Sequence, residues 1–128
     1  MITSDTYVEK AVSTESADFN KITDRLSKTD TIRLLHAALG LCTEVGEFQD
    51  MLKKHIFYGK PIDIVNAKEE IGDTLWYIGL AIDVLQTTMN EIMTGNIEKL
   101  QARYPEKFNE GKAINRNLST EREILEKI

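Results

Sequence analysis

The stretch LCTEVGEFQDMLKK, residues 41–54, combines the apolar spacing of a helix with two carboxylates on its apolar side. Its apolar residues recur every three or four positions, which predicts a helix that packs one face against a core. On a helical wheel Glu44 lies on the same side as these apolar residues, and Glu47 lies roughly 60° away from Glu44. A carboxylate on a packed face costs free energy unless a partner neutralises it. The two acids therefore depart from ordinary core packing.

A second stretch, NAKEEIGDTLWYIGLAIDVL at residues 66–85, repeats this arrangement. Glu70 and Asp73 lie three residues apart on its inward side, and the stretch is apolar around most of its circumference, which predicts a central helix. A short loop separates it from the first helix, so we expect the two helices to pack antiparallel. The acids of the two helices would then converge.

Four converging carboxylates need a shared cation. We expect Glu44, Glu47, Glu70 and Asp73 to be metal ligands, because like charges buried together repel one another strongly. Oxygen-only ligands select a hard cation, Mg²⁺ with Mn²⁺ as a substitute, and Mg²⁺ commonly binds substrate phosphates as well. Isolated E-x-x-E pairs are common on solvated helix surfaces. Two pairs on the apolar faces of consecutive helices favour a site over that alternative.

The remaining patterns predict an all-α protein, an antiparallel helical bundle with two long central helices. Gly59 and Pro61 end the first of these helices, Thr88 with Glu91 forms a capping-box pattern, and Thr29 or Asp30 can cap the first helix. Cys42 lies in an apolar stretch and is expected to be a buried free thiol. We expect one domain over 1–128. It would comprise an N-terminal segment of uncertain role (1–28), core helices (31–103), an irregular C-terminal arm (106–118) and a short final helix (119–128) begun by Ser119 or Thr120.

Composition excludes several classes of protein. The chain has 128 residues, a formal net charge of −5 and 41% hydrophobic residues. An acidic domain is a poor ligand for a nucleic acid polymer. The most apolar run has only about twelve residues, too few to span a membrane. The N-terminus is polar and does not look like a signal peptide, and a single cysteine favours an intracellular, cytoplasmic location.

The motif E-x-x-E, 22 residues, then E-x-x-D resembles the MazG-like branch of the all-α nucleoside triphosphate pyrophosphohydrolases. The segments that carry the resemblance are TEVGEFQDMLKK, KEEIGDTLWY and NIEKLQARYPEKF, within residues 31–110. The resemblance implies Mg²⁺-dependent cleavage of a (deoxy)nucleoside triphosphate between its α and β phosphates, giving monophosphate and pyrophosphate. It also implies a homodimer or homotetramer, and metal ligation by the same four acids.

Further side chains are candidates for the reaction. Glu47, at the edge of its stripe, is the predicted catalytic base. The predicted substrate-binding residues are Lys54, Asn66, Tyr77, Lys99 and Arg103. Each also has an ordinary structural explanation: an ion pair with Glu47 or Asp50 for Lys54, a solvated helix face for Lys99 and Arg103, a helix cap for Asn66 and a core position for Tyr77. Weaker candidates for a role at the site are His36, His55, Lys112 and Arg116. Trp76 is expected in the core or in a subunit interface.

Alternatives to this function remain open. The sequence has no Walker loop and no G-x-G-x-x-G, which excludes P-loop and Rossmann nucleotide binding. Within the enzyme class the substrate could be dUTP, dCTP, a damaged nucleotide or phosphoribosyl-ATP. A non-catalytic helical interaction or regulatory module with a cation site is the alternative from another class. In either case the apolar second helix needs cover, which predicts a partner subunit.

Overall fold

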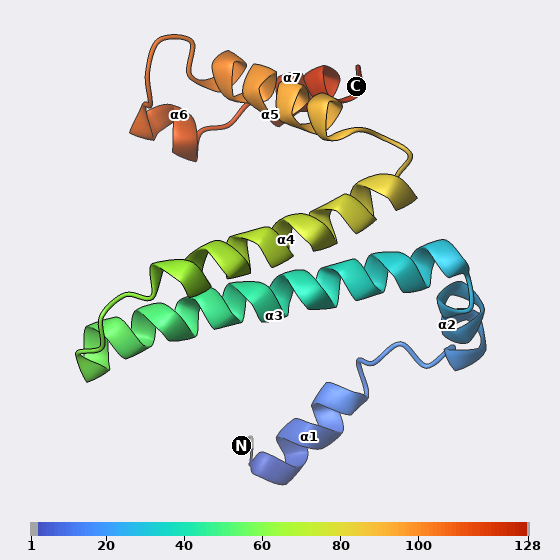
Figure 1. Ribbon diagram of the computed structural model, residues 1–128. Coiled ribbons are helices and arrows are strands. Elements are labelled where there is room, and N and C mark those ends of the chain that lie inside the picture. The colour runs from blue at the N-terminus through green and yellow to red at the C-terminus, as the bar shows by residue number, and fades with distance from the viewer. Residues whose placement is uncertain (1–2, 128) are drawn as a thin grey trace.

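The structure is a computed structural model that describes residues 3–127. These residues form helices and loops without a strand, which confirms the predicted all-α class (Figure 1). The helices in chain order are α1 (Ser4–Val12), α2 (Phe19–Leu26), α3 (Thr29–Tyr58), α4 (Ile64–Val84), α5 (Met89–Arg103), α6 (Glu110–Ile114) and α7 (Leu118–Leu125). Within this described part, no helix combines the length and apolar character needed to cross a membrane.

The long helices α3 and α4 form an antiparallel hairpin, as predicted (Figure 1). The turn between them begins at Gly59, whose φ of 67° is the left-handed conformation that glycine adopts without strain. Helix α4 is capped by Asp63, whose carboxylate accepts hydrogen bonds at 3.1 Å from the backbone N–H groups of Val65 and Asn66. The loop and the cap together set the register in which the acids of α3 face those of α4.

Several predicted boundaries need correction. Helix α3 begins after Lys28, with no side-chain cap, so neither Thr29 nor Asp30 caps it. Residues 106–118 are not wholly irregular, because they contain the short helix α6 with Asn109 as its cap. Asn117, rather than Ser119 or Thr120, caps α7. Asn side chains accept N–H groups at helix starts as readily as Ser or Thr. The capping box at Thr88 is confirmed.

The last three helices form a cluster of their own. Helix α5 packs against α7, whereas the main partner of α3 is α4 (Figure 1). Helix α2 folds back against the start of α3, and α1 extends away from it. The chain is therefore an α3–α4 hairpin with additions at both ends.

The single chain is open and buries few side chains. Its accessible surface is 10,338 Å², whereas a compact protein of 14.6 kDa exposes about 6,900 Å². Among the described residues, the buried apolar side chains are Ala37 and Met51. Cys42 is exposed, so the prediction of a buried thiol was wrong. Helical spacing placed it correctly on an apolar stretch, but it lies on a side of α3 that the described residues leave exposed.

Candidate functional site

The α3–α4 hairpin brings three of the predicted metal ligands together. Carboxylate oxygens of Glu44 on α3 and of Glu70 and Asp73 on α4 all lie within 4.8 Å of one another. Glu70 is only 3% exposed, while Glu44 is half-buried and Asp73 is exposed. The cluster thus has a buried floor and an open side through which a ligand can enter.

Glu70 carries the electrostatic strain of the cluster. Burial raises the pKa of its carboxyl above the ordinary value, and the negative charges of Glu47 and Glu44 act in the same direction. The Asn66 amide Nδ2 donates a 2.6 Å hydrogen bond to Glu70 Oε1 and opposes the rise in pKa. A single neutral donor does not replace the water that burial removes from a carboxylate. A cation bound here would relieve both burial and repulsion.

Glu47 lies beside these three acids without joining them. Its charge is felt at Glu70, and it lines a cavity of about 550 Å³ together with Asp50, Lys54 and Asn66. The role of Glu47 as a fourth metal ligand therefore stays a prediction. Its position on the wall of a cavity next to the acids also suits a group that exchanges a proton with something bound there.

The donor chemistry fits a hard divalent cation. The converging side chains offer only carboxylate oxygens, and the neighbouring group is an amide that can hold a carboxylate in place. Such a set fits Mg²⁺ or Mn²⁺ better than a metal that prefers nitrogen or sulfur. The residues present at this site are therefore suited to a metal-dependent reaction on an anionic substrate.

Lys54 and Asn66 both line the cavity beside the acids, and their role in substrate binding stays a prediction. The Lys54 ammonium also forms a 2.6 Å ion pair with Asp50, as its structural explanation predicted. Asp50 binds Lys53 as well, and these two lysines, Lys53 foremost, lower the pKa of the Asp50 carboxyl to about 2. Asn66 is not a helix cap, because its side chain binds Glu70.

Tyr77 lies one turn beyond Asp73 and is half-buried across Gly40 of α3. The backbone of α3 passes so closely that a Cβ atom at Gly40 would overlap the Tyr77 ring. His36 and Trp76 meet the same ring edge-on, with centroid distances of 5.7 Å and 4.9 Å. Trp76 is 59% exposed, so it is not a core residue of the single chain. An aromatic group therefore borders the acids on the side away from the loop.

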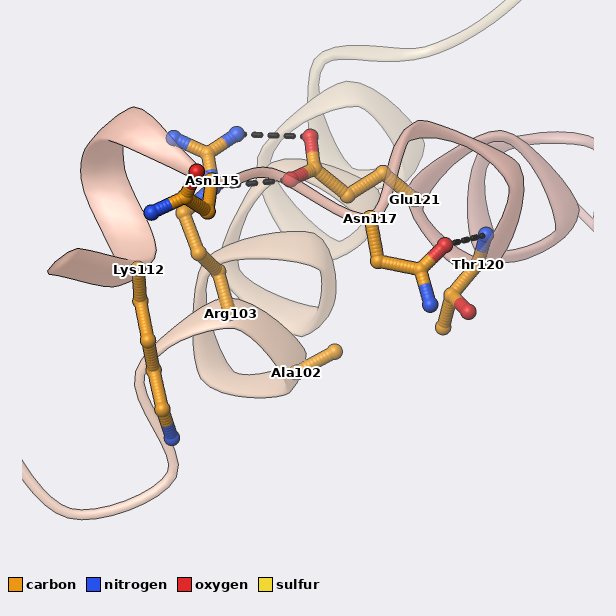
Figure 2. A pocket seen from close by; sticks show the side chains of 7 residues that line it. All are labelled: Ala102, Arg103, Lys112, Asn115, Asn117, Thr120 and Glu121. Atoms are coloured by element: carbon orange, nitrogen blue, oxygen red, sulfur yellow. Dashed lines mark hydrogen bonds and ion pairs between the residues drawn. The ribbon is translucent and has the colours of Figure 1, made fainter.

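The structure places Arg103 in a different environment from the acids. Its guanidinium forms a double hydrogen bond with the buried carboxylate of Glu121 on α7, at 2.8 Å and 2.6 Å (Figure 2). Arg116 also binds this carboxylate, at 2.5 Å, and the two arginines lower the pKa of Glu121 to about 2. Lys99 is half-buried on α5. A structural role of Arg103, in joining α5 to α7, is thus directly visible.

One residue of the hairpin loop, Lys60, was missed by the sequence analysis. Lys60 lines a second cavity, of about 290 Å³, next to the first. His55 Nδ1 donates a 2.7 Å hydrogen bond to the carbonyl of Lys60, so this histidine holds the loop. The signal was a lysine placed directly after the glycine that ends a helix, at the loop end of the acid-bearing faces.

The antiparallel pair of α3 and α4 thus gathers carboxylates beside a cavity lined by Lys54, an arrangement suited to a divalent cation and an anionic ligand. The sequence profile of the MazG nucleotide pyrophosphohydrolase domain matches residues 34–108, which is more than half of the chain. The chain therefore belongs to the MazG family of nucleotide pyrophosphohydrolases. No curated protein and no solved structure matches it significantly.

Proposed function

We propose that the protein hydrolyses a (deoxy)nucleoside triphosphate at the α–β phosphate bond, in a Mg²⁺-dependent reaction that yields a monophosphate and pyrophosphate. The observation that carries this proposal is the convergence of Glu44, Glu70 and Asp73 within 4.8 Å in a MazG domain. Mg²⁺, or Mn²⁺ in its place, supplies charge neutralisation at the phosphates and a more acidic water when it is bound. The proposed location is the cytoplasm, where nucleoside triphosphates are available.

In this proposal the side chains around the acids divide the work. Glu47 takes a proton from the attacking water, whose oxygen forms the new bond to the α phosphorus while the bond to the bridging oxygen breaks. Pyrophosphate leaves with that bridging oxygen. Lys54 and Asn66 line the cavity that receives the phosphates, and Tyr77 contacts the sugar or base. Lys99 and Arg103 stay predictions, since Arg103 is bound to Glu121 in this chain.

The test is a panel of nucleotides with Mg²⁺, read out as pyrophosphate release and identified products. The panel includes dUTP, dCTP, oxidised nucleotides and phosphoribosyl-ATP, so that it also separates the narrower substrate alternatives. We expect Glu70→Ala to abolish turnover while the protein stays folded, and Glu69→Ala, at an exposed neighbouring acid, to retain it. Full turnover by Glu47→Gln would exclude Glu47 as the proton acceptor.

The alternative of a non-catalytic interaction or regulatory module makes a different prediction. Such a module would show a rise in melting temperature with Mg²⁺ alone and no turnover of any nucleotide. The buried, poorly compensated Glu70 fits both functions, because each needs the cation. The family favours the enzyme.

We also propose that the working unit is a homodimer or homotetramer. Apolar side chains of the hairpin that are half or more exposed include Ile71 and Leu75 on α4 and Leu39 on α3. Ile71 and Leu75 line an apolar depression of about 470 Å³ together with Val45 and other residues of α3. An apolar surface of this extent on one chain is typical of a face that a partner subunit covers.

A further inference from the structure

The two cavities at the loop end of the hairpin form one continuous recess beside the acids. The first, of about 550 Å³, is bordered by Glu47, and the second, of about 290 Å³, is bordered by Lys60. Met51, Lys54 and Asn66 line both. Since Asn66 also binds Glu70, the recess lies next to the acid cluster and extends from there to the loop.

Lys60 is held at the far end of this recess by its backbone. Its N–H donates a 3.2 Å hydrogen bond to the carbonyl of Lys54, and its own carbonyl accepts the 2.7 Å bond from His55. The left-handed Gly59 turns the chain so that both bonds form. The side chain of Lys60 therefore starts from a fixed point, and among the described residues its ammonium has no ion-pair partner.

The charges around Lys60 leave it able to bind an anion. The acid that lines the second cavity with Lys60 is Asp63, whose carboxylate already accepts two N–H groups at the start of α4. Asp50, in the first cavity, is occupied by Lys53 and Lys54. Lysine ammonium groups are common partners of phosphate oxygens, and Lys60 is the cation of the recess whose charge no acid takes up.

The order of groups along the hairpin gives the recess a direction. Glu47 and Lys54 are seven residues apart on α3, a rise of about 10 Å, and the loop with Lys60 lies beyond Lys54. Tyr77, with its aromatic neighbours, lies on the opposite side of the acids. An extended polyphosphate whose reacting end sits at the acids would thus point its terminal phosphate toward the loop.

We propose that Lys60 binds the terminal phosphate of a nucleoside triphosphate and makes the protein prefer triphosphates to diphosphates. This inference rests on the proposed function for the position of the α and β phosphates at the acids. Lys54, which lines both cavities, contacts the phosphates of either nucleotide. Lys60 reaches only the third phosphate, because it borders the second cavity alone.

The kinetic test compares Lys60→Gln with Lys53→Gln, which removes a charge that lies outside both cavities. We expect Lys60→Gln to lower kcat/KM for the best triphosphate of the panel about tenfold or more, the usual effect of losing a charge-assisted hydrogen bond. The inhibition constant of the matching nucleoside diphosphate should change less than twofold. Equal losses for both nucleotides, or equal effects of the two variants, would overturn the assignment.

A binding test separates this inference from the proposed function. Inorganic tripolyphosphate with Mg²⁺ is titrated calorimetrically into the wild type and both variants, whose folding is checked by circular dichroism. We expect weaker binding, about tenfold, in Lys60→Gln alone. If no nucleotide is hydrolysed but this difference appears, the hydrolytic function fails and the phosphate site at Lys60 stands. Unchanged binding in Lys60→Gln, or no binding by the wild type, overturns the site.

Discussion

Glu70 is the side chain on which the site depends most directly. It is buried with one neutral hydrogen-bond donor and three acids nearby, and its pKa is raised in the folded protein. A carboxyl group whose pKa rises on folding stabilises the folded state in its protonated form. Its contribution is therefore lost as the pH rises from the ordinary value of 4.5 through the raised pKa. Above the raised pKa the metal-free protein holds a buried, charged carboxylate.

Glu70→Gln should remove this buried charge and keep the bond from Asn66, because the glutamine oxygen still accepts it. We expect the metal-free variant to melt at a higher temperature than the wild type at pH 7 and to lose the stabilisation by Mg²⁺. Thermal melting between pH 4 and 8, with and without Mg²⁺, measures both. Glu69→Gln is the control, and a variant less stable than the wild type at pH 7 would contradict the argument.

Gly40 is another position that tolerates no side chain. Its missing side chain is what lets the Tyr77 ring cross α3 next to the acids. Gly40→Ala should cost about 1–3 kcal/mol, the usual effect of overpacking, and should move Tyr77. Gly46→Ala, on the same helix with nothing within 4 Å of the added Cβ, should stabilise by about 0.5–1 kcal/mol. Urea denaturation of both variants checks this, and equal effects would refute it.

Among the helices, the contact between α5 and α7 is organised by one buried acid. Glu121 is 5% exposed and binds Arg103 and Arg116, which lower its pKa to about 2 (Figure 2). A lowered pKa means that the ion pairs stabilise the folded protein fully at pH values above 4.5, the ordinary pKa of a glutamate. That stabilisation is lost as the pH falls from 4.5 toward 2. Acid should therefore loosen α7 from α5.

Glu121→Gln should reproduce this loosening at neutral pH, since it removes the charge and leaves two arginines without their partner. We expect a lower melting temperature at pH 7 and a smaller further loss on acidification to pH 3 than in the wild type. Circular dichroism melting curves at both pH values provide the measurement. The control is Glu123→Gln, at an exposed acid on the same helix, which should melt as the wild type does. If Glu121→Gln also melted as the wild type does, the ion pairs would not be what holds α7 against α5.

The helices show what periodicity and end signals can predict. The end of α3 and the bounds of α4 and α5 followed from apolar spacing, Gly59 and Thr88, and the facing of Glu44 with Glu70 followed from the short loop. Helix α6 was missed because five residues are too few for a period. The pairing of Arg103 with Glu121 was missed because they are 18 residues apart, a separation that no helical rule connects.

The whole molecule shows where a single sequence reaches its limit. Spacing identifies which side of a helix is apolar, but it does not say what covers that side. Cys42 and Trp76 were therefore assigned to packed surroundings that this chain does not provide by itself. The accessible surface is about one and a half times that of a compact chain of this mass, and the need for a partner stays a prediction.

Association should depend on the apolar depression of the hairpin. We expect light scattering to report a dimer or tetramer at micromolar concentration, and Ile71→Glu to shift it toward the monomer, because a charge there would be desolvated on association. Thr94→Glu adds the same charge at an exposed polar position of α5 and should leave the mass unchanged. A compact wild-type monomer would end the proposal of a homo-oligomer.

The large open surface of the isolated chain also changes what its stability means. If most of the apolar burial happens between subunits, folding and association share one equilibrium, and its position depends on how much protein is present. Diluting a solution of this protein would then favour the unfolded chain, as warming does. Specific activity that falls on dilution and recovers when the protein is concentrated again would demonstrate that coupling.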